Sequence, residues 1–95
     1  MRNKKILSAA RDCSCQWCGR MDGTTVAAHS NQLRHGKGMG IKASDQYVAF
    51  LCFSCHHELD QGRSLSKEQR QLLWQSAHEK TKQLLIGMGL LEAND

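Results

Sequence analysis

Two pairs of cysteines have the spacing of metal-binding knuckles. The first pair is Cys15 and Cys18, the second is Cys52 and Cys55, and two residues separate the sulfurs in each pair. This spacing lets both thiolates of a pair point at one ion, and four thiolates suit tetrahedral zinc. The sequence therefore predicts a structural zinc site formed by these four residues. Cys13 is an alternative to Cys15 as a ligand, and otherwise a small buried residue or a free thiol.

The second cysteine pair has another possible interpretation. Residues 52–56 match the attachment motif of c-type haem, because His56 follows directly after the pair. Haem attachment needs export in most systems, and no apolar run of the length found in signal peptides follows the basic N-terminus. We therefore expect zinc in a cytoplasmic protein, where cysteines stay reduced. No apolar stretch is long enough to span a bilayer, so we expect no membrane partner.

Basic residues exceed acidic ones, and they are unevenly distributed. The 95-residue chain has 13 Lys and Arg against 9 Asp and Glu, a formal net charge of +4. Such an excess favours a polyanionic partner, for which nucleic acid is the usual candidate. Residues 1–11 and 33–42 contain no acid. The candidate nucleic-acid-binding residues in these two segments are Arg2, Lys4, Lys5, Arg34 and Lys37. A solvated loop is the alternative for the second segment.

Two short strands are expected from their β-branched and apolar residues. They are residues 24–28, which lead to His29, and residues 47–51, which lead to Cys52. The polar segment between them is rich in glycine and is typical of a loop. A helix that carries His56 is expected after the second cysteine pair.

The C-terminal part of the chain predicts a long amphipathic helix. Ser66 and Gln69 have the spacing of a capping box. Mostly apolar residues then recur at helical spacing; they are Leu73, Ala77, Thr81, Leu84 and Leu85, with Trp74 on their flank. Gly87 and Gly89 supply a stop signal. We interpret this helix as packing rather than chemistry, and residues 3–10 as a short helix or a basic arm.

The order of these features is knuckle, strand, histidine, loop, strand, knuckle, histidine and helix. This order resembles the HNH, or ββα-metal, nuclease family, including nucleases of phages and lambdoid prophages. The residues that carry the resemblance are Cys15, Cys18, residues 26–29, Asp45, residues 47–51, Cys52, Cys55 and His56. The resemblance covers roughly residues 1–65. It implies an α+β fold, a small HNH-like zinc-knuckle domain with a C-terminal packing helix, in one domain over residues 1–95.

The resemblance also implies a function, a metal-dependent endonuclease that hydrolyses phosphodiester bonds in DNA. His29 would be the general base that deprotonates water, and Asp45 would orient its ring. His56 would bind the catalytic ion. Asp60, four residues later on the same helical face, and His57 are further candidate ligands. Mg²⁺ or Mn²⁺ would prefer the carboxylate, whereas Zn²⁺ would accept both ligand types.

One departure from the family supports an alternative function. Many members have an acidic residue directly before the base, and here that position is Ala28. The alternative is a non-catalytic zinc module that binds DNA or a recombination protein. The oligomeric state stays open, although a homodimer would supply two sites for cutting two strands.

The candidate residues also have simpler interpretations. His29 could be a strand-end residue satisfied by a hydrogen bond, and His56 could cap the zinc knuckle or replace a cysteine ligand. Asp45 could be a turn residue and Asp60 an ordinary exposed acid. The remaining histidines, His35 and His78, are expected at the surface.

Overall fold

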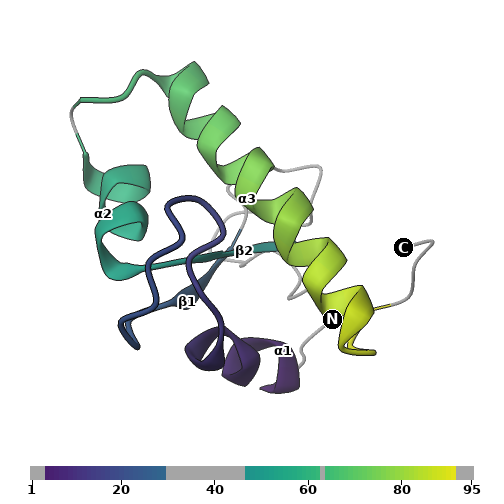
Figure 1. The fold of residues 1–95 in the computed structure, drawn as a ribbon. Coiled ribbons are helices and arrows are strands. Elements are labelled where there is room, and N and C mark those ends of the chain that lie inside the picture. The colour runs from purple at the N-terminus through teal and green to yellow at the C-terminus, as the bar shows by residue number, and fades with distance from the viewer. Residues whose placement is uncertain (1–3, 30–46, 63, 92–95) are drawn as a thin grey trace.

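The computed structural model describes residues 4–29, 47–62 and 64–91. Within these residues the chain forms a two-stranded sheet and three α-helices (Figure 1). The elements are α1 (Lys4–Ala9), the 3₁₀ turn η1 (Ala10–Asp12), β1 (Val26–His29), β2 (Val48–Leu51), α2 (Phe53–Gln61) and α3 (Lys67–Gly87). The small α+β architecture is therefore confirmed, with two strands followed by a helix.

The two strands form an antiparallel pair whose second strand is entirely buried. Ala28 lies opposite Ala49, and His29 lies opposite Val48. Side chains of a strand alternate between its two faces, and β2 uses both faces for packing. Ala49 and Leu51 join one core cluster with residues of α2 and α3, whereas Val48 and Phe50 join a second cluster. In Figure 1, α3 runs across β2 and α1 lies below the strands.

The first strand begins two residues later than the sequence predicts. Thr24 and Thr25 precede β1 rather than form part of it. The reason is a local competition for hydrogen bonds. The Thr24 hydroxyl donates to the Asp22 carboxylate over 2.5 Å and accepts from the amide of Phe53 over 3.1 Å. Thr24 thus ties the loop before β1 to the first residue of α2.

Helix α3 begins and ends as its sequence predicts. The Ser66 hydroxyl accepts from the amide of Gln69 over 3.1 Å, and the Gln69 side chain accepts from the amide of Ser66 over 2.7 Å. The capping box is therefore confirmed. After the helix ends at Gly87, Gly89 has a φ of +76°, a conformation that suits glycine.

The buried face of α3 holds β2 by a polar contact as well as by packing. The Thr81 hydroxyl accepts from the amide of Phe50 over 2.9 Å and donates to the carbonyl of Ala77 over 2.7 Å. Thr81 and Phe50 are both fully buried. Thr81 therefore satisfies a main-chain donor of β2 that the neighbouring strand does not use.

The expectation that His78 lies at the surface is wrong. His78 is only 7% exposed, and its Nδ1 lies 2.8 Å from the carbonyl oxygen of Val48. Its ring stacks on Trp74 at a centroid distance of 4.7 Å. Burial is tolerated because the carbonyl satisfies a ring nitrogen while the aromatic face covers the rest of the ring.

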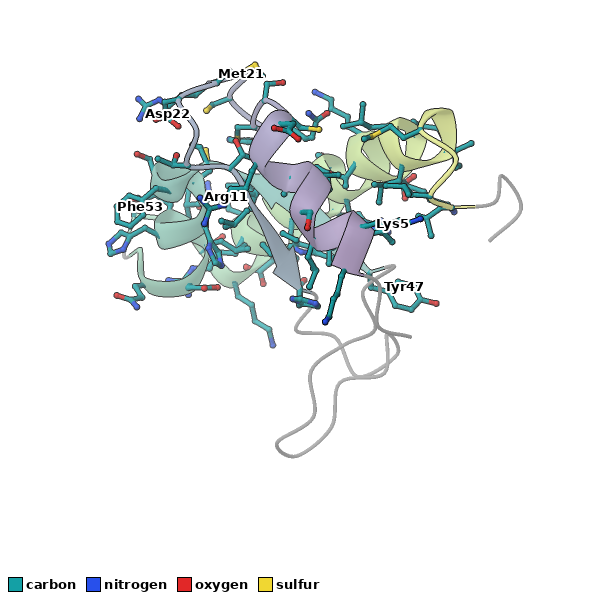
Figure 2. The ribbon with its side chains drawn as sticks, turned by 90° about the horizontal axis from the view of Figure 1, so that it is seen from below. Lys5, Arg11, Met21, Asp22, Tyr47 and Phe53 are labelled. Atoms are coloured by element: carbon teal, nitrogen blue, oxygen red, sulfur yellow. The ribbon has the colours of Figure 1, made fainter. Side chains whose placement is uncertain are left out.

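The N-terminal segment is a helix that belongs to the core. Ile6, Ala9 and Ala10 are buried against Phe50 and Leu85. The prediction of a short helix over residues 3–10 is therefore confirmed over Lys4–Ala9. Figure 2, seen from below, shows α1 in front with Lys5 near its start, and the loop residues Met21 and Asp22 on the far side from Tyr47.

Candidate metal centre and the neighbouring groove

The four cysteines of the two predicted knuckles come together in space. Their sulfur atoms all lie within 4.8 Å of one another. Cys15 and Cys18 lie in the loop between η1 and β1, whereas Cys52 and Cys55 lie at the start of α2. The amide of Gln16 donates to the carbonyl of Phe50 over 2.8 Å, which places the first knuckle beside the end of β2.

The first knuckle directs main-chain amides at a sulfur. The amides of Trp17 and Cys18 lie 3.5 and 3.4 Å from the Cys15 Sγ. The amide of Gly19 donates to the carbonyl of Cys15 over 3.0 Å, and Gly19 has a φ of +82°. The turn therefore favours glycine at this position. Amides aimed at sulfur stabilise a thiolate rather than a thiol.

The pKa values of the thiols respond to this arrangement. Burial alone would raise the pKa of Cys15, but the amides of Cys18, Cys52 and Trp17 lower it to about 7. Burial and the three neighbouring thiol groups raise the pKa of Cys55. One thiolate is thus favoured and a second is opposed, mainly because burial disfavours the charged form of Cys55 and secondarily because of its thiol neighbours and the charge of Cys15.

The donor set fits a structural metal ion such as zinc. A divalent cation removes the repulsion between thiolates, and four sulfurs at this spacing satisfy a tetrahedral ion. Cys15 and Cys52 are buried, at 2% and 0% exposure, so a bound ion would be shielded from water on one side. Because Cys52 and Cys55 share this site with the first knuckle, the arrangement favours a metal over haem attachment.

Cys13 lies outside the cluster. It is partly buried and packs against the core cluster that contains Ile6 and Phe50. Burial, followed by the charge of Asp12, raises the pKa of its thiol. Of the two alternative ligands in the first knuckle, the structure brings Cys15 to the other sulfurs.

A groove on the surface contains two of the predicted site residues. It has a volume of about 720 Å³ and lies between the end of β1, α2 and the first half of α3. The lining residues are His29, Leu59, Asp60, Lys67, Arg70, Gln71 and Trp74. The predicted base and one predicted metal ligand therefore face the same space.

The histidines of α2 have different surroundings. The Nε2 of His56 lies 3.0 Å from an Oδ2 of Asp60, one helical turn away, and both side chains are partly exposed. His57 is exposed, and its ring stacks on Phe53. Within residues 4–29, 47–62 and 64–91, the four cysteines are the sole group of three or more possible metal ligands. The structure thus pairs His56 with Asp60 and leaves His57 apart from them.

The remaining predicted residues have simple placements. Lys4 and Lys5 are exposed on α1. Four candidates lie outside the described residues; they are Arg2, Arg34, Lys37 and Asp45. His35, expected at the surface, also lies outside them.

The contribution of α3 to the groove is not among the features that the sequence predicts. Lys67, Arg70, Gln71 and Trp74 follow the i, i+3, i+4, i+7 spacing of one helical face. That spacing was a usable signal, but the apolar stripe of α3 predicts packing alone. The first two turns of the helix line the groove, and the later turns cover β2.

Comparisons with protein-family models, with curated proteins and with solved structures find no match to this chain. Among the described residues, no helix is long and apolar enough to cross a bilayer. The fold and the site define a small α+β protein that has a tetracysteine cluster fit for a structural metal and a groove lined by an imidazole, a carboxylate and two cations.

Proposed function

We propose that this protein is a metal-dependent endonuclease that hydrolyses phosphodiester bonds in DNA. The observation that carries the proposal is the lining of the groove, where His29 and Asp60 occur together with the cations Lys67 and Arg70. Hydrolysis of a phosphodiester needs a base for water, a ligand for a divalent ion and positive charge for the phosphate. The groove offers a residue for each of these tasks.

His29 is the proposed general base. It is the last residue of β1, where its ring reaches the groove while its main chain belongs to the sheet. The indole of Trp74 donates to the carbonyl of Ala28, the preceding residue, over 3.0 Å. A base must lie within hydrogen-bond reach of its water. The strand pairing and the bond from Trp74 hold the main chain at His29 in place, so the position of its ring is limited to the rotation of its own side chain.

Asp60 and His56 are the proposed ligands of the catalytic ion. Their side chains approach each other to 3.0 Å, so both could bind one divalent ion. A divalent ion held there would act as a Lewis acid toward the phosphate and the leaving oxygen. The carboxylate of Asp60 favours Mg²⁺ or Mn²⁺, and the imidazole also permits Zn²⁺.

The tetracysteine centre has a structural role in this proposal. Cys52 and Cys55 flank the first turn of α2, and Cys15 belongs to a loop that is hydrogen-bonded to β2. Zinc bound to both knuckles would fix α2 relative to the hairpin. Asp60 on α2 would then keep its position relative to His29 on β1.

The proposal is tested by a plasmid-nicking assay with Mg²⁺, Mn²⁺ or Zn²⁺. We expect Asp60→Asn to reduce nicking strongly, because a neutral amide lacks the negative charge with which a carboxylate binds a divalent ion. The matched control is Asp12→Asn, an exposed acid on η1. Equal nicking rates for Asp60→Asn and the wild type would contradict the assignment of the metal ligand.

A second candidate function is a non-catalytic zinc module that binds DNA or a recombination protein. It is favoured by Ala28, which is 2% exposed and packs in the core cluster with Trp74. No side chain at that position contributes a third ligand to the groove. This candidate predicts salt-sensitive DNA binding without cleavage products in any of the three metals.

A further inference from the structure

We infer that Lys67 and Arg70 form a phosphate-binding wall of the groove, which holds the backbone of a nucleic-acid strand against the start of α3. The inference rests on the proposed function for the nature of the ligand. It goes beyond that function because it assigns DNA binding to α3 rather than to the basic segments at residues 1–11 and 33–42.

Arg70 has no anionic partner among the residues that the structure describes. One guanidinium nitrogen, Nη2, donates to the carbonyl of Gly62. Its Nε is buried and has no hydrogen-bond partner in the described part of the chain. Within the described residues no carboxylate forms an ion pair with it. A partly buried guanidinium without a counter-charge is costly, and a phosphate is the ligand whose oxygens match its fork of donors.

The position of Arg70 depends on a close contact at the end of α2. The amide of Gly62 donates to the carbonyls of His57 and Glu58, which ends the helix. A Cβ at Gly62 would lie 2.6 Å from the Glu58 carbonyl oxygen and 2.8 Å from its Cα. Glycine is therefore required for space, and the carbonyl that it places next to α3 anchors Arg70.

Lys67 extends the positive charge toward the helix start. It is the first residue of α3, exposed, and three residues before Arg70. Residues at this spacing are neighbours on a helix, about 5–6 Å apart at Cβ. The N-terminus of the 21-residue helix adds partial positive charge of its own. The two side chains can therefore contact one phosphate or two adjacent ones.

The charge balance of the groove favours a polyanion. The groove has one acidic lining residue, Asp60, which lies 3.0 Å from the ring of His56, against two cations, Lys67 and Arg70, that have no ion pair among the described residues. The volume of about 720 Å³ exceeds what one phosphate group fills. An extended strand with regularly spaced phosphates fits both properties.

The test uses the full chain with the His29→Ala substitution, so that cleavage does not disturb a binding measurement. The fluorescence anisotropy of a labelled DNA duplex is followed at several salt concentrations without added divalent metal. Lys67→Gln and Arg70→Gln are added separately, with Lys80→Gln as the control, an exposed lysine on the same helix outside the groove. Zinc content and circular dichroism confirm that each variant is folded.

We expect each of the two groove substitutions to weaken binding several-fold and to reduce the salt dependence of log K by about one unit per contact. Arg70→Lys should retain part of the affinity, since it keeps the charge but loses the fork. Unchanged affinity and salt dependence in both Gln variants would overturn the inference, even if the wild type cleaves DNA. Weakened binding in both, with no cleavage by the wild type in any metal, would support the inference and reject the proposed nuclease.

Discussion

The indole Nε1 of Trp74 donates a hydrogen bond to the main-chain carbonyl of Ala28 over 3.0 Å. Trp74 is 4% exposed and Ala28 is 2% exposed, so the bond is shielded from water. Because Ala28 directly precedes His29, this bond ties the strand end that carries the proposed base to α3. The Ala28 carbonyl therefore links the packing of α3 to the position of the proposed base.

Replacement of Trp74 by Phe tests this bond. The ring of Phe retains most of the buried area but removes the indole donor to the Ala28 carbonyl. We expect the free energy of unfolding to fall by about 0.5–1.5 kcal/mol, the net contribution of one hydrogen bond. Urea denaturation measures the change. The control is Trp17→Phe at a 46% exposed site, for which a change within about 0.5 kcal/mol is expected. Equal losses in the two variants would argue against the bond.

Loss of one buried ligand should release the structural zinc. Cys52→Ser replaces a fully buried thiol of the tetracysteine centre. Structural zinc contributes many kcal/mol to folding, so we expect the thermal midpoint to fall by more than about 10 °C. Cys13→Ser is the control, since Cys13 lies outside the cluster. Zinc content by atomic absorption and thermal unfolding measure both variants; zinc loss in Cys13→Ser with retention in Cys52→Ser would reverse the ligand assignment.

The metal-free protein should ionise Cys15 first. Despite its burial, the amides of the knuckle lower the pKa of this thiol from 9.0 to about 7. A depressed pKa in the folded state contributes stability that is fully present above about pH 9 and is lost as pH falls through about 7. In a pH titration of the metal-free protein, the ultraviolet absorbance of the thiolates should therefore show a first step near pH 7. Cys15→Ser should remove this step. A single step near pH 9 would mean that the knuckle amides are not organised before zinc binds.

An added methyl group at Gly62 should displace the end of α2. Because the Cβ would overlap the main chain of Glu58, Gly62→Ala forces the backbone to shift. Such overpacking costs about 1–3 kcal/mol, and the carbonyl that anchors Arg70 moves with it. Urea denaturation and DNA-binding anisotropy measure the two effects. The matched control is Gly87→Ala, where the added atom meets no neighbour. An equal free energy of unfolding for the two variants would contradict the close contact at Gly62.

The features that the sequence predicts well are those encoded by short spacings. The cysteine pairs and the capping box of Ser66 and Gln69 depend on residues three positions apart, so the local pattern carries the whole signal. The choice of Cys15 over Cys13 needed the position of the second knuckle in space.

Contacts between distant segments account for what the sequence does not predict. His78 is buried because the carbonyl of Val48, 30 residues earlier, meets its ring. Arg70 lines the groove because the carbonyl at the end of α2 holds its guanidinium. Neither partner is marked by residue type, since both are main-chain oxygens, and only the fold brings them within reach.

The most direct test of the proposed mechanism compares DNA nicking by the wild type and by His29→Ala, with Mg²⁺ or Mn²⁺ and with zinc content measured in both. We expect nicking by the wild type alone, with equal zinc content, because the variant loses the base and keeps the tetracysteine centre. Full activity in His29→Ala would contradict His29 as the base. If neither protein nicks DNA while zinc is bound, the nuclease function is contradicted. The function that then stands is a zinc module that binds DNA or a recombination protein.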